Sequence, residues 1–295
     1  MKPYTQVALF FAITQIIGIY SGMVLVTGAA ESEEIQAFSI APMPENDPLN
    51  AVCFIGYILF GAVMIILVAR FYKGVVLFKL LELVVIVSAS TIVFFTIGIS
   101  LLSLGFVKSI LFGAAAGIAV GAAKFFTARA KNTAAIISSA GVGALFGFSL
   151  GFLPTVLFVI LLSIYDYIAV FKTKHMIEMA RELSTRQLSF AVTAKSLPKR
   201  KPKEKREQYV DRAMQEGERL DLGTGDLSVP VMISVSAFSL GASGLVYSLA
   251  VAAGSTLAIY MLLRFVSKQK VFLPALPPIC LGGMLALLLV LVAGF

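Results

Sequence analysis

Residues 155–171 read TVLFVILLSIYDYIAVF, an apolar run interrupted by one carboxylate, Asp166. Residues 222–240 read LGTGDLSVPVMISVSAFSL and also carry one acid, Asp226, near the start of the run. A membrane-spanning helix needs about 20 predominantly apolar residues, so both runs are candidate spans. A carboxylate inside such a run is costly and normally faces a protein interior or a water-filled cavity. These stretches predict a membrane protein with a polar site between two helices.

The composition of the whole chain favours the same class of protein. Hydrophobic residues make up 59% of the 295 positions and charged residues 14%, which is more apolar than an ordinary soluble domain. The net charge is +8, but the basic residues lie in short connectors beside apolar runs, where they act as topology signals. We therefore expect contact with the lipid bilayer and no binding of nucleic acid.

Apolar windows of spanning length occur nine times along the chain. They cover approximately residues 4–27, 50–71, 75–97, 104–124, 133–153, 155–171, 222–240, 245–264 and 271–294. Glycines repeat every four residues at 113, 117 and 121 and again at 143, 147 and 151, which predicts close helix packing there. The sequence thus predicts an all-α polytopic membrane protein with nine transmembrane helices.

Lysine and arginine between the spans set the predicted orientation. Every second connector is basic, and such connectors favour the cytoplasmic side, while the connector over residues 31–47 is acidic. We therefore predict a multi-pass protein of the cell membrane with a cytoplasmic N-terminus and an extracytoplasmic C-terminus. The first run could instead be a cleaved signal peptide, because small residues follow it, but it is longer than a typical signal core.

A polar segment divides the chain into three predicted parts. Residues 1–173 form an N-terminal bundle with spans one to six, and residues 221–295 form a C-terminal bundle with spans seven to nine. Between them, residues 174–220 are charged and contain proline, which predicts a flexible cytoplasmic loop. A short polar helix could form at its end, over residues 209–220.

The two acids are predicted to lie at the same depth. Asp166 precedes Lys172 by six residues, which places it about 9 Å inside the cytoplasmic boundary of a helical span. Asp226 follows Arg219 by seven residues, hence about 10 Å inside the same boundary. Because spans six and seven run in opposite directions, the two carboxylates can meet. Another acid, Glu82 in span three, is expected to pair with Lys79, one turn away.

Two carboxyl groups at one site can hydrolyse a peptide bond. One acts as general base on a water molecule, and the other, protonated, donates to the carbonyl oxygen or the leaving nitrogen. Two such groups a few ångströms apart share a proton, so one pair supplies both roles. Asp166 and Asp226 are therefore the predicted catalytic residues, with no cofactor. No metal is expected either, because the single histidine, His175, cannot build a usual zinc site.

Residues near both acids suit a reaction inside a membrane. Asp226 follows Gly223-Thr224-Gly225, in which the glycines permit close approach of another chain. Residues 273–278 read LPALPP at the start of span nine, and three prolines within this segment oppose a regular helix. Pro274 lies about 6 Å inside the boundary, near the level of the two acids. An extended substrate could pair with the backbone groups left free there.

Three of these motifs resemble the signatures of the presenilin and signal peptide peptidase family. They are Tyr165-Asp166 followed by Ala169-Val170, the GxGD motif from Gly223 to Asp226, and Leu273-Pro274-Ala275-Leu276-Pro277. The nine predicted spans, with a loop between spans six and seven, extend the resemblance over most of the chain. Its features fit a compact prokaryotic homologue, for example an archaeal presenilin homologue.

The resemblance implies an activity and a set of site residues. It implies an intramembrane aspartyl endopeptidase in which Asp166 and Asp226 are the catalytic pair and the Pro-Ala-Leu segment shapes the site and binds substrate. The residues expected to shape the site or bind substrate are Tyr165, Gly223, Thr224, Gly225, Leu273, Pro274, Ala275 and Leu276. Thr224 departs from the family, which usually has leucine there, so substrate preference at that position stays open.

Other functions compete with this interpretation. An ion or proton-coupled transporter or channel would use Asp166 and Asp226 as ion-binding carboxylates, although the sequence shows no inverted repeats. A membrane scaffold would use them structurally. A rhomboid-type serine protease is excluded, because Ser243 and His175 are predicted on opposite faces, about 30 Å apart. The expected partners are transmembrane protein or peptide substrates and the bilayer, and the sequence is compatible with a homo-oligomer.

Overall fold

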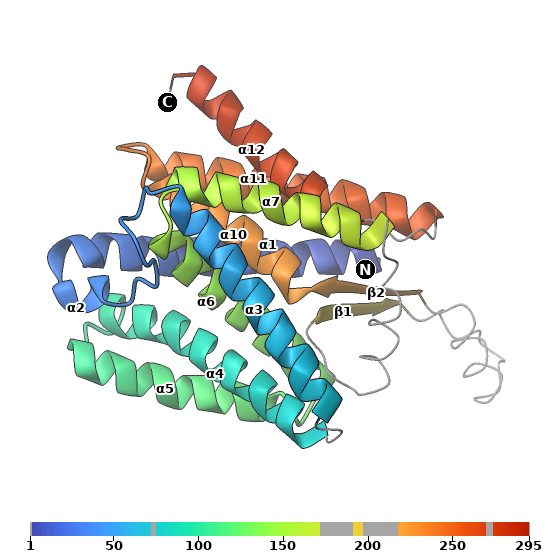
Figure 1. The fold of residues 1–295 in the computed structure, drawn as a ribbon, viewed down its shortest axis with the longest axis horizontal. Coiled ribbons are helices and arrows are strands. Elements are labelled where there is room, and N and C mark those ends of the chain that lie inside the picture. The colour runs from blue at the N-terminus through green and yellow to red at the C-terminus, as the bar shows by residue number, and fades with distance from the viewer. Residues whose placement is uncertain (1, 72–74, 172–190, 197–217, 270–273, 295) are drawn as a thin grey trace, which may run out of the picture.

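This computed structural model of the chain describes residues 2–71, 75–171, 191–196, 218–269 and 274–294. These residues form a bundle of helices with a small sheet at one end (Figure 1). The helices are α1 (Pro3–Glu31), α2 (Glu33–Gln36), α3 (Leu49–Phe71), α4 (Val75–Ser100), α5 (Phe106–Ala123), α6 (Ala128–Ser149), α7 (Phe152–Phe171), α10 (Thr224–Phe238), α11 (Gly244–Gln269) and α12 (Leu276–Val292). The strands are β1 (Ala191–Ser196) and β2 (Glu218–Gly223).

Each predicted span coincides with one long helix within the described part of the chain. Five of these helices, α1, α4, α5, α6 and α11, are long and apolar enough to cross a membrane. The other four, α3, α7, α10 and α12, contribute shorter apolar stretches. The expectation of a helical membrane protein is therefore confirmed, while the number of nine crossings and the orientation of the termini stay predictions.

The two-stranded sheet departs from the expected all-α fold. A helix is predicted from Leu222, but Leu222 belongs to β2 and α10 begins only at Thr224. β1 pairs antiparallel with β2, with Val192 opposite Leu222 and Thr193 opposite Asp221. The side chains of Val192, Ala194 and Leu222 are buried against the helices, as the alternation of a half-buried strand requires.

The sheet also lies partly in the segment predicted as a flexible loop. β1 falls inside residues 174–220, and residues 218–220 are strand where a short polar helix is predicted. The rest of that helix, residues 209–217, and the remainder of the loop lie outside the described residues.

The bundle has α10 at its centre. α4 and α5 lie along one side, α1, α6 and α10 occupy the middle, and α7, α11 and α12 lie on the other side, with α3 crossing the bundle (Figure 1). Every residue of α10 from Leu227 to Ala237 is buried, as expected for a helix that is apolar all round. The helix that carries Asp226 is therefore held by protein on all sides.

Glycines on α6 allow close packing against α10. A Cβ atom added at Gly147 would lie 2.6 Å from the carbonyl oxygen of Met232, and one at Gly143 would lie 2.5 Å from that of Ser228. Any larger residue would therefore meet the backbone of α10 rather than a flexible side chain. The predicted packing role of this glycine repeat is thus observed, and the partner helix is the one that carries Asp226.

Candidate active site

Both intramembrane acids line one cavity of about 530 Å³. Asp166 reaches it from α7 and Asp226 from α10, and the walls are mainly apolar side chains of α4, α6, α7 and α10. Of the other residues expected at the site, five also line it: Tyr165, Gly223, Thr224, Gly225 and Leu276. Motifs that lie far apart in the sequence therefore meet around one space.

The segment before α12 reaches this cavity only through its last residue. Pro274 is buried and Ala275 is partly buried and caps α12, but neither lines the cavity. Leu276, the first residue of α12, does line it, whereas Leu273 lies outside the described residues. α12 begins at Leu276, and Pro274 and Ala275 before it are not helical, as expected for a proline-containing segment; the predicted start, Val271, lies outside the described residues.

Asp166 is held at its place by the start of α12. Its side chain is only 8% exposed, near the end of α7. The backbone N–H of Leu276 donates a hydrogen bond to its carboxyl group, and Oδ2 has no hydrogen-bond partner among the described residues. The first N–H groups of a helix have no partner within the helix, and Pro277 and Pro278 have no N–H. Leu276 is therefore the donor that this helix start can offer.

Asp226 is held by the helix start to which it belongs. Gly223 is the N-cap of α10 and Asp226 is the third helical residue, and the N–H of Gly223 donates a hydrogen bond to the Asp226 carboxyl group. This is the acidic half of a capping box, in which the third residue reaches back to the N-cap amide. A Cβ atom at Gly223 would lie 3.3 Å from Oδ2 of Asp226, so the glycine leaves room for the carboxyl group.

The two carboxyl groups interact with each other. Asp166 lies close enough to Asp226 for its charge to act on that carboxyl group. The thiol of Cys280 lies within electrostatic range of both carboxyl groups and forms a hydrogen bond with the side chain of Ser163 of α7. The arrangement thus presents two carboxyl groups from different helices to one cavity, each with a backbone donor of its own.

The predicted depth of Asp226 rests on a helical path that the structure does not have. It assumes a helix from Arg219, but Arg219 to Gly223 form a strand, which rises about 3.3 Å per residue instead of 1.5 Å. The chain therefore advances further between Arg219 and Asp226 than a helix would.

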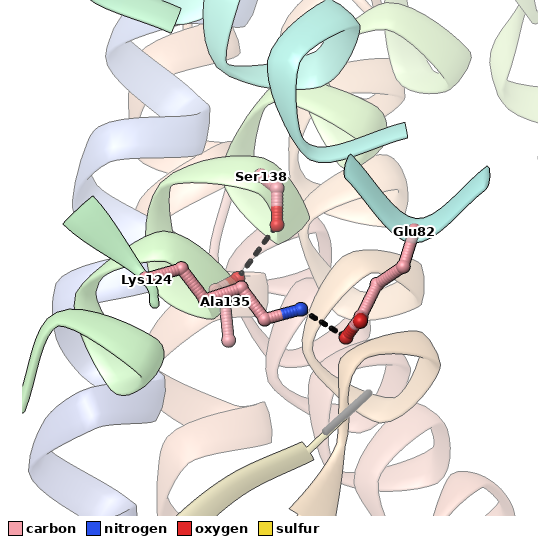
Figure 2. A network of polar contacts seen from close by, with 4 residues as sticks. All are labelled: Glu82, Lys124, Ala135 and Ser138. Atoms are coloured by element: carbon pink, nitrogen blue, oxygen red, sulfur yellow. Dashed lines mark hydrogen bonds and ion pairs between the residues drawn. The ribbon is translucent and has the colours of Figure 1, made fainter. Parts of the chain in front are cut away.

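A buried ion pair lies beside the cavity. Lys124, at the C-terminal end of α5, pairs with Glu82 of α4, and both side chains are buried (Figure 2). Lys124 also lines the cavity. The predicted pairing of Glu82 with Lys79 is wrong in that the observed ion pair joins two helices, while Lys79 is exposed. Lys79 lies one turn from Glu82 on the same helix but is exposed. The buried Glu82 carboxylate pairs instead with the buried ammonium group of Lys124 on the neighbouring helix.

Helix α6 contributes a wall of the site that the sequence analysis missed. Its cavity-lining residues include Lys131, Ser138 and Ser139, and Ser138 donates a hydrogen bond of 3.3 Å to the carbonyl oxygen of Ala135 (Figure 2). A signal was present, because α6 is the least apolar of the five long membrane helices. Polar residues on a spanning helix normally face protein or a cavity. Across the described ranges, no group of three or more His, Cys, Asp or Glu could hold a metal ion.

Comparison with known proteins matches this arrangement to a family. The family model for "Signal-peptide peptidase, presenilin aspartyl protease" matches residues 9–294, and no curated protein matches the chain. A solved presenilin family intramembrane aspartate protease in space group C222 is 23% identical, with a TM-score of 0.69, over 99% of this chain and 100% of that chain. Another such structure, in space group P2, is 21% identical, with a TM-score of 0.63, over 97% of this chain and 96% of that chain. These identities show a shared fold, and the family model spans nearly the whole sequence. The chain belongs to the signal-peptide peptidase and presenilin family of intramembrane aspartyl proteases.

Proposed function

We propose that this protein hydrolyses peptide bonds of transmembrane substrates with Asp166 and Asp226 as a general acid/base pair. The observation that carries the proposal is the convergence of the two carboxyl groups on one cavity within an apolar bundle. A pair in such surroundings holds one shared proton, so one group is ionised and the other protonated. We further propose that the enzyme resides in the cell membrane with its N-terminus on the cytoplasmic side.

The two carboxyl groups divide the reaction between them. The ionised aspartate takes a proton from a water molecule, whose oxygen forms a bond to the carbonyl carbon of the substrate. The protonated aspartate donates its proton to the carbonyl oxygen. The tetrahedral intermediate then collapses: one of its two hydroxyl groups returns a proton to the aspartate that acted as general acid, the C=O bond re-forms, the C–N bond breaks, and the leaving nitrogen takes the proton gained by the general base. The net change is addition of one water, and the pair returns to its singly protonated state.

The surrounding residues prepare the pair and leave space for substrate. The N–H groups of Leu276 and Gly223 restrict Asp166 and Asp226, respectively, to orientations facing the cavity. Nothing lies within 4 Å of a Cβ atom built at Gly225, so an unwound substrate backbone can approach there. We assign substrate contact to Tyr165, Thr224 and Leu276, which line the cavity, and support of the site to Leu273, Pro274 and Ala275.

An ion transporter with the same two acids is less well supported. An ion path would place polar groups along a route across the bilayer. The cavity that contains the two acids is instead walled mainly by apolar residues such as Phe146, Phe158 and Met232.

The test uses purified full-length protein and a synthetic transmembrane peptide. Asp166→Asn and Asp226→Asn should each lower the cleavage rate by about 10³-fold or more, because each removes one of the two proton-transfer roles. Asp47→Asn is the matched control, since Asp47 accepts a hydrogen bond from Leu49 N in the loop before α3, away from the cavity. Cleavage retained in either cavity variant would reject the pair. Ion flux in liposomes that is lost in these variants, without cleavage by the wild type, would favour the transporter.

A further inference from the structure

Asn132, the fifth residue of α6, holds the sheet that leads into Asp226. Its side-chain Nδ2 donates a hydrogen bond of 2.8 Å to the carbonyl oxygen of Thr193, and the N–H of Thr193 donates one of 3.1 Å to its Oδ1. A neighbouring strand would make the same pair of bonds. One side chain of α6 thus replaces a third strand at the outer edge of β1, where unpaired backbone groups would otherwise remain.

The position of β1 is transmitted to Asp226 through the backbone. Thr193 lies opposite Asp221 in the antiparallel pairing, so holding β1 at Thr193 sets the position of β2. β2 ends at Gly223, which is also the N-cap of α10 and the hydrogen-bond donor to the Asp226 carboxyl group. No connecting segment separates the sheet from the helix. A displacement of the sheet therefore moves the group that orients Asp226.

The residues between the sheet and Asp226 do little by themselves to fix the position of the Asp226 carboxyl group. Gly223 and Gly225 flank Thr224, and glycine is the residue that restricts the backbone least. The inner face of the sheet, formed by Val192, Ala194 and Leu222, packs in one buried cluster that includes residues of α1, α6 and α11. Apolar packing is non-directional and resists sliding along the strand poorly. The two hydrogen bonds from Asn132 are directional, so they hold β1 against sliding where the apolar packing does not.

We propose that Asn132 is a positioning residue of the active site: by replacing a third strand it fixes β1 and β2, and through Gly223 it orients the Asp226 carboxyl group. The catalytic part of this inference rests on the proposed two-aspartate function. Asn132 is not among the residues that line the cavity, so any effect it has on the reaction is indirect.

The experiment compares Asn132 with an asparagine that makes the same kind of contacts elsewhere. Asn50 accepts at Oδ1 from the N–H of Met43 at 3.2 Å and donates from Nδ2 to the carbonyl oxygens of Met43 at 3.3 Å and Pro44 at 2.8 Å. It lies at the start of α3, at the end of the bundle away from the sheet (Figure 1). At opposite ends of the molecule, Asn132→Ala and Asn50→Ala therefore each remove a reciprocal pair of side-chain-to-backbone bonds, and Asn50→Ala also removes a third. Asn132→Asp keeps the acceptor for Thr193 and loses the donor, and it serves if Asn132→Ala does not fold.

Two readouts are measured on the full-length protein in detergent: kcat and KM with a transmembrane peptide, and hydrogen exchange of segments 191–196 and 218–226. We expect Asn132→Ala to lower kcat by about tenfold to a hundredfold with little change in KM, because a catalytic group is displaced rather than removed. Exchange should accelerate in both segments. Asn50→Ala should lower the unfolding temperature at least as much, because Asn50 is fully buried and makes one bond more, and should leave kcat and both segments unchanged.

The outcomes separate this inference from the proposed function. If kcat of Asn132→Ala equals that of Asn50→Ala, or if exchange over residues 218–226 does not change, Asn132 does not position the site. If the wild type cleaves no transmembrane peptide, the proposed function fails. The exchange data then decide alone: acceleration over 218–226 in the Asn132 variants supports transmission to the Asp226 segment, and unchanged exchange overturns it.

Discussion

Gly147→Ala adds only one methyl group, but we predict that it lowers kcat. Ordinary van der Waals contact begins at 3.4 Å, whereas the new Cβ would lie 2.6 Å from the carbonyl oxygen of Met232. That oxygen belongs to the backbone of α10, so no rotation of a side chain relieves the contact. The helix has to move away from α6 by about 0.8 Å, the difference between these two distances.

This movement should reach the catalytic pair, because Asp226 lies on the same helix as Met232. A misplacement of about 1 Å at a reacting group can lower the rate by about a hundredfold, so we expect kcat to fall by about tenfold to a hundredfold. KM should change little, since no group that contacts substrate is removed. Overpacking in a well-packed interior should also lower the free energy of unfolding by about 1–3 kcal/mol.

Gly113→Ala provides the control for this experiment. A Cβ at Gly113 would also lie 2.6 Å from a backbone carbonyl oxygen, that of Thr91, but at the contact of α5 with α4 and not with α10. Both variants are assayed for unfolding and for kcat and KM with a transmembrane peptide. The reasoning predicts comparable losses of stability and a loss of kcat only in Gly147→Ala. Equal kcat values in the two variants would refute the proposed transmission through α10.

Three further predictions follow from the site. Gly223→Ala should lower kcat about tenfold, since its Cβ would lie 3.3 Å from Oδ2 of Asp226; steady-state cleavage at the wild-type rate would show that the carboxyl group does not need this space. Glu82→Gln leaves the buried Lys124 without its ionised partner and should lower the free energy of unfolding by about 3–5 kcal/mol, which thermal or denaturant unfolding measures; a variant as stable as the wild type would contradict an essential ion pair. The rate of cleavage should peak at mildly acidic pH. At higher pH both groups ionise and the pair loses its general acid, and at lower pH both are protonated and it loses its general base. A pH–rate profile that is flat between about pH 4 and 9 would count against a shared proton.

Hydrophobic patterning was sufficient to predict the existence of the nine long helices among the residues that the structure describes, although not every boundary. In a bilayer every backbone N–H and C=O must be satisfied within its own segment, so an apolar run of spanning length adopts a helix almost regardless of its neighbours. The two acids were identifiable for a related reason, since a carboxylate in such a run has a high cost and calls for a function. The spacing of the GxGD motif also specifies a helix start, because Gly223 is the N-cap and Asp226 the third residue of the same helix.

The tertiary structure decided which of these elements meet. β1 is only six residues long, so its pattern is too short to predict a strand, and its pairing partner begins more than 20 residues later. Glu82 pairs with Lys124 and Asn132 with Thr193, in both cases across helices or strands that are remote in the sequence. Apolar periodicity reports how much of a segment is buried but not against what, because the hydrophobic effect has no direction. The sequence by itself therefore determined the helices, the family resemblance and the two acids. It also predicted that the two acids can meet, whereas the walls of their cavity and the sheet that leads into Asp226 depended on specific hydrogen bonds, ion pairs and glycine contacts that only the folded chain brings together.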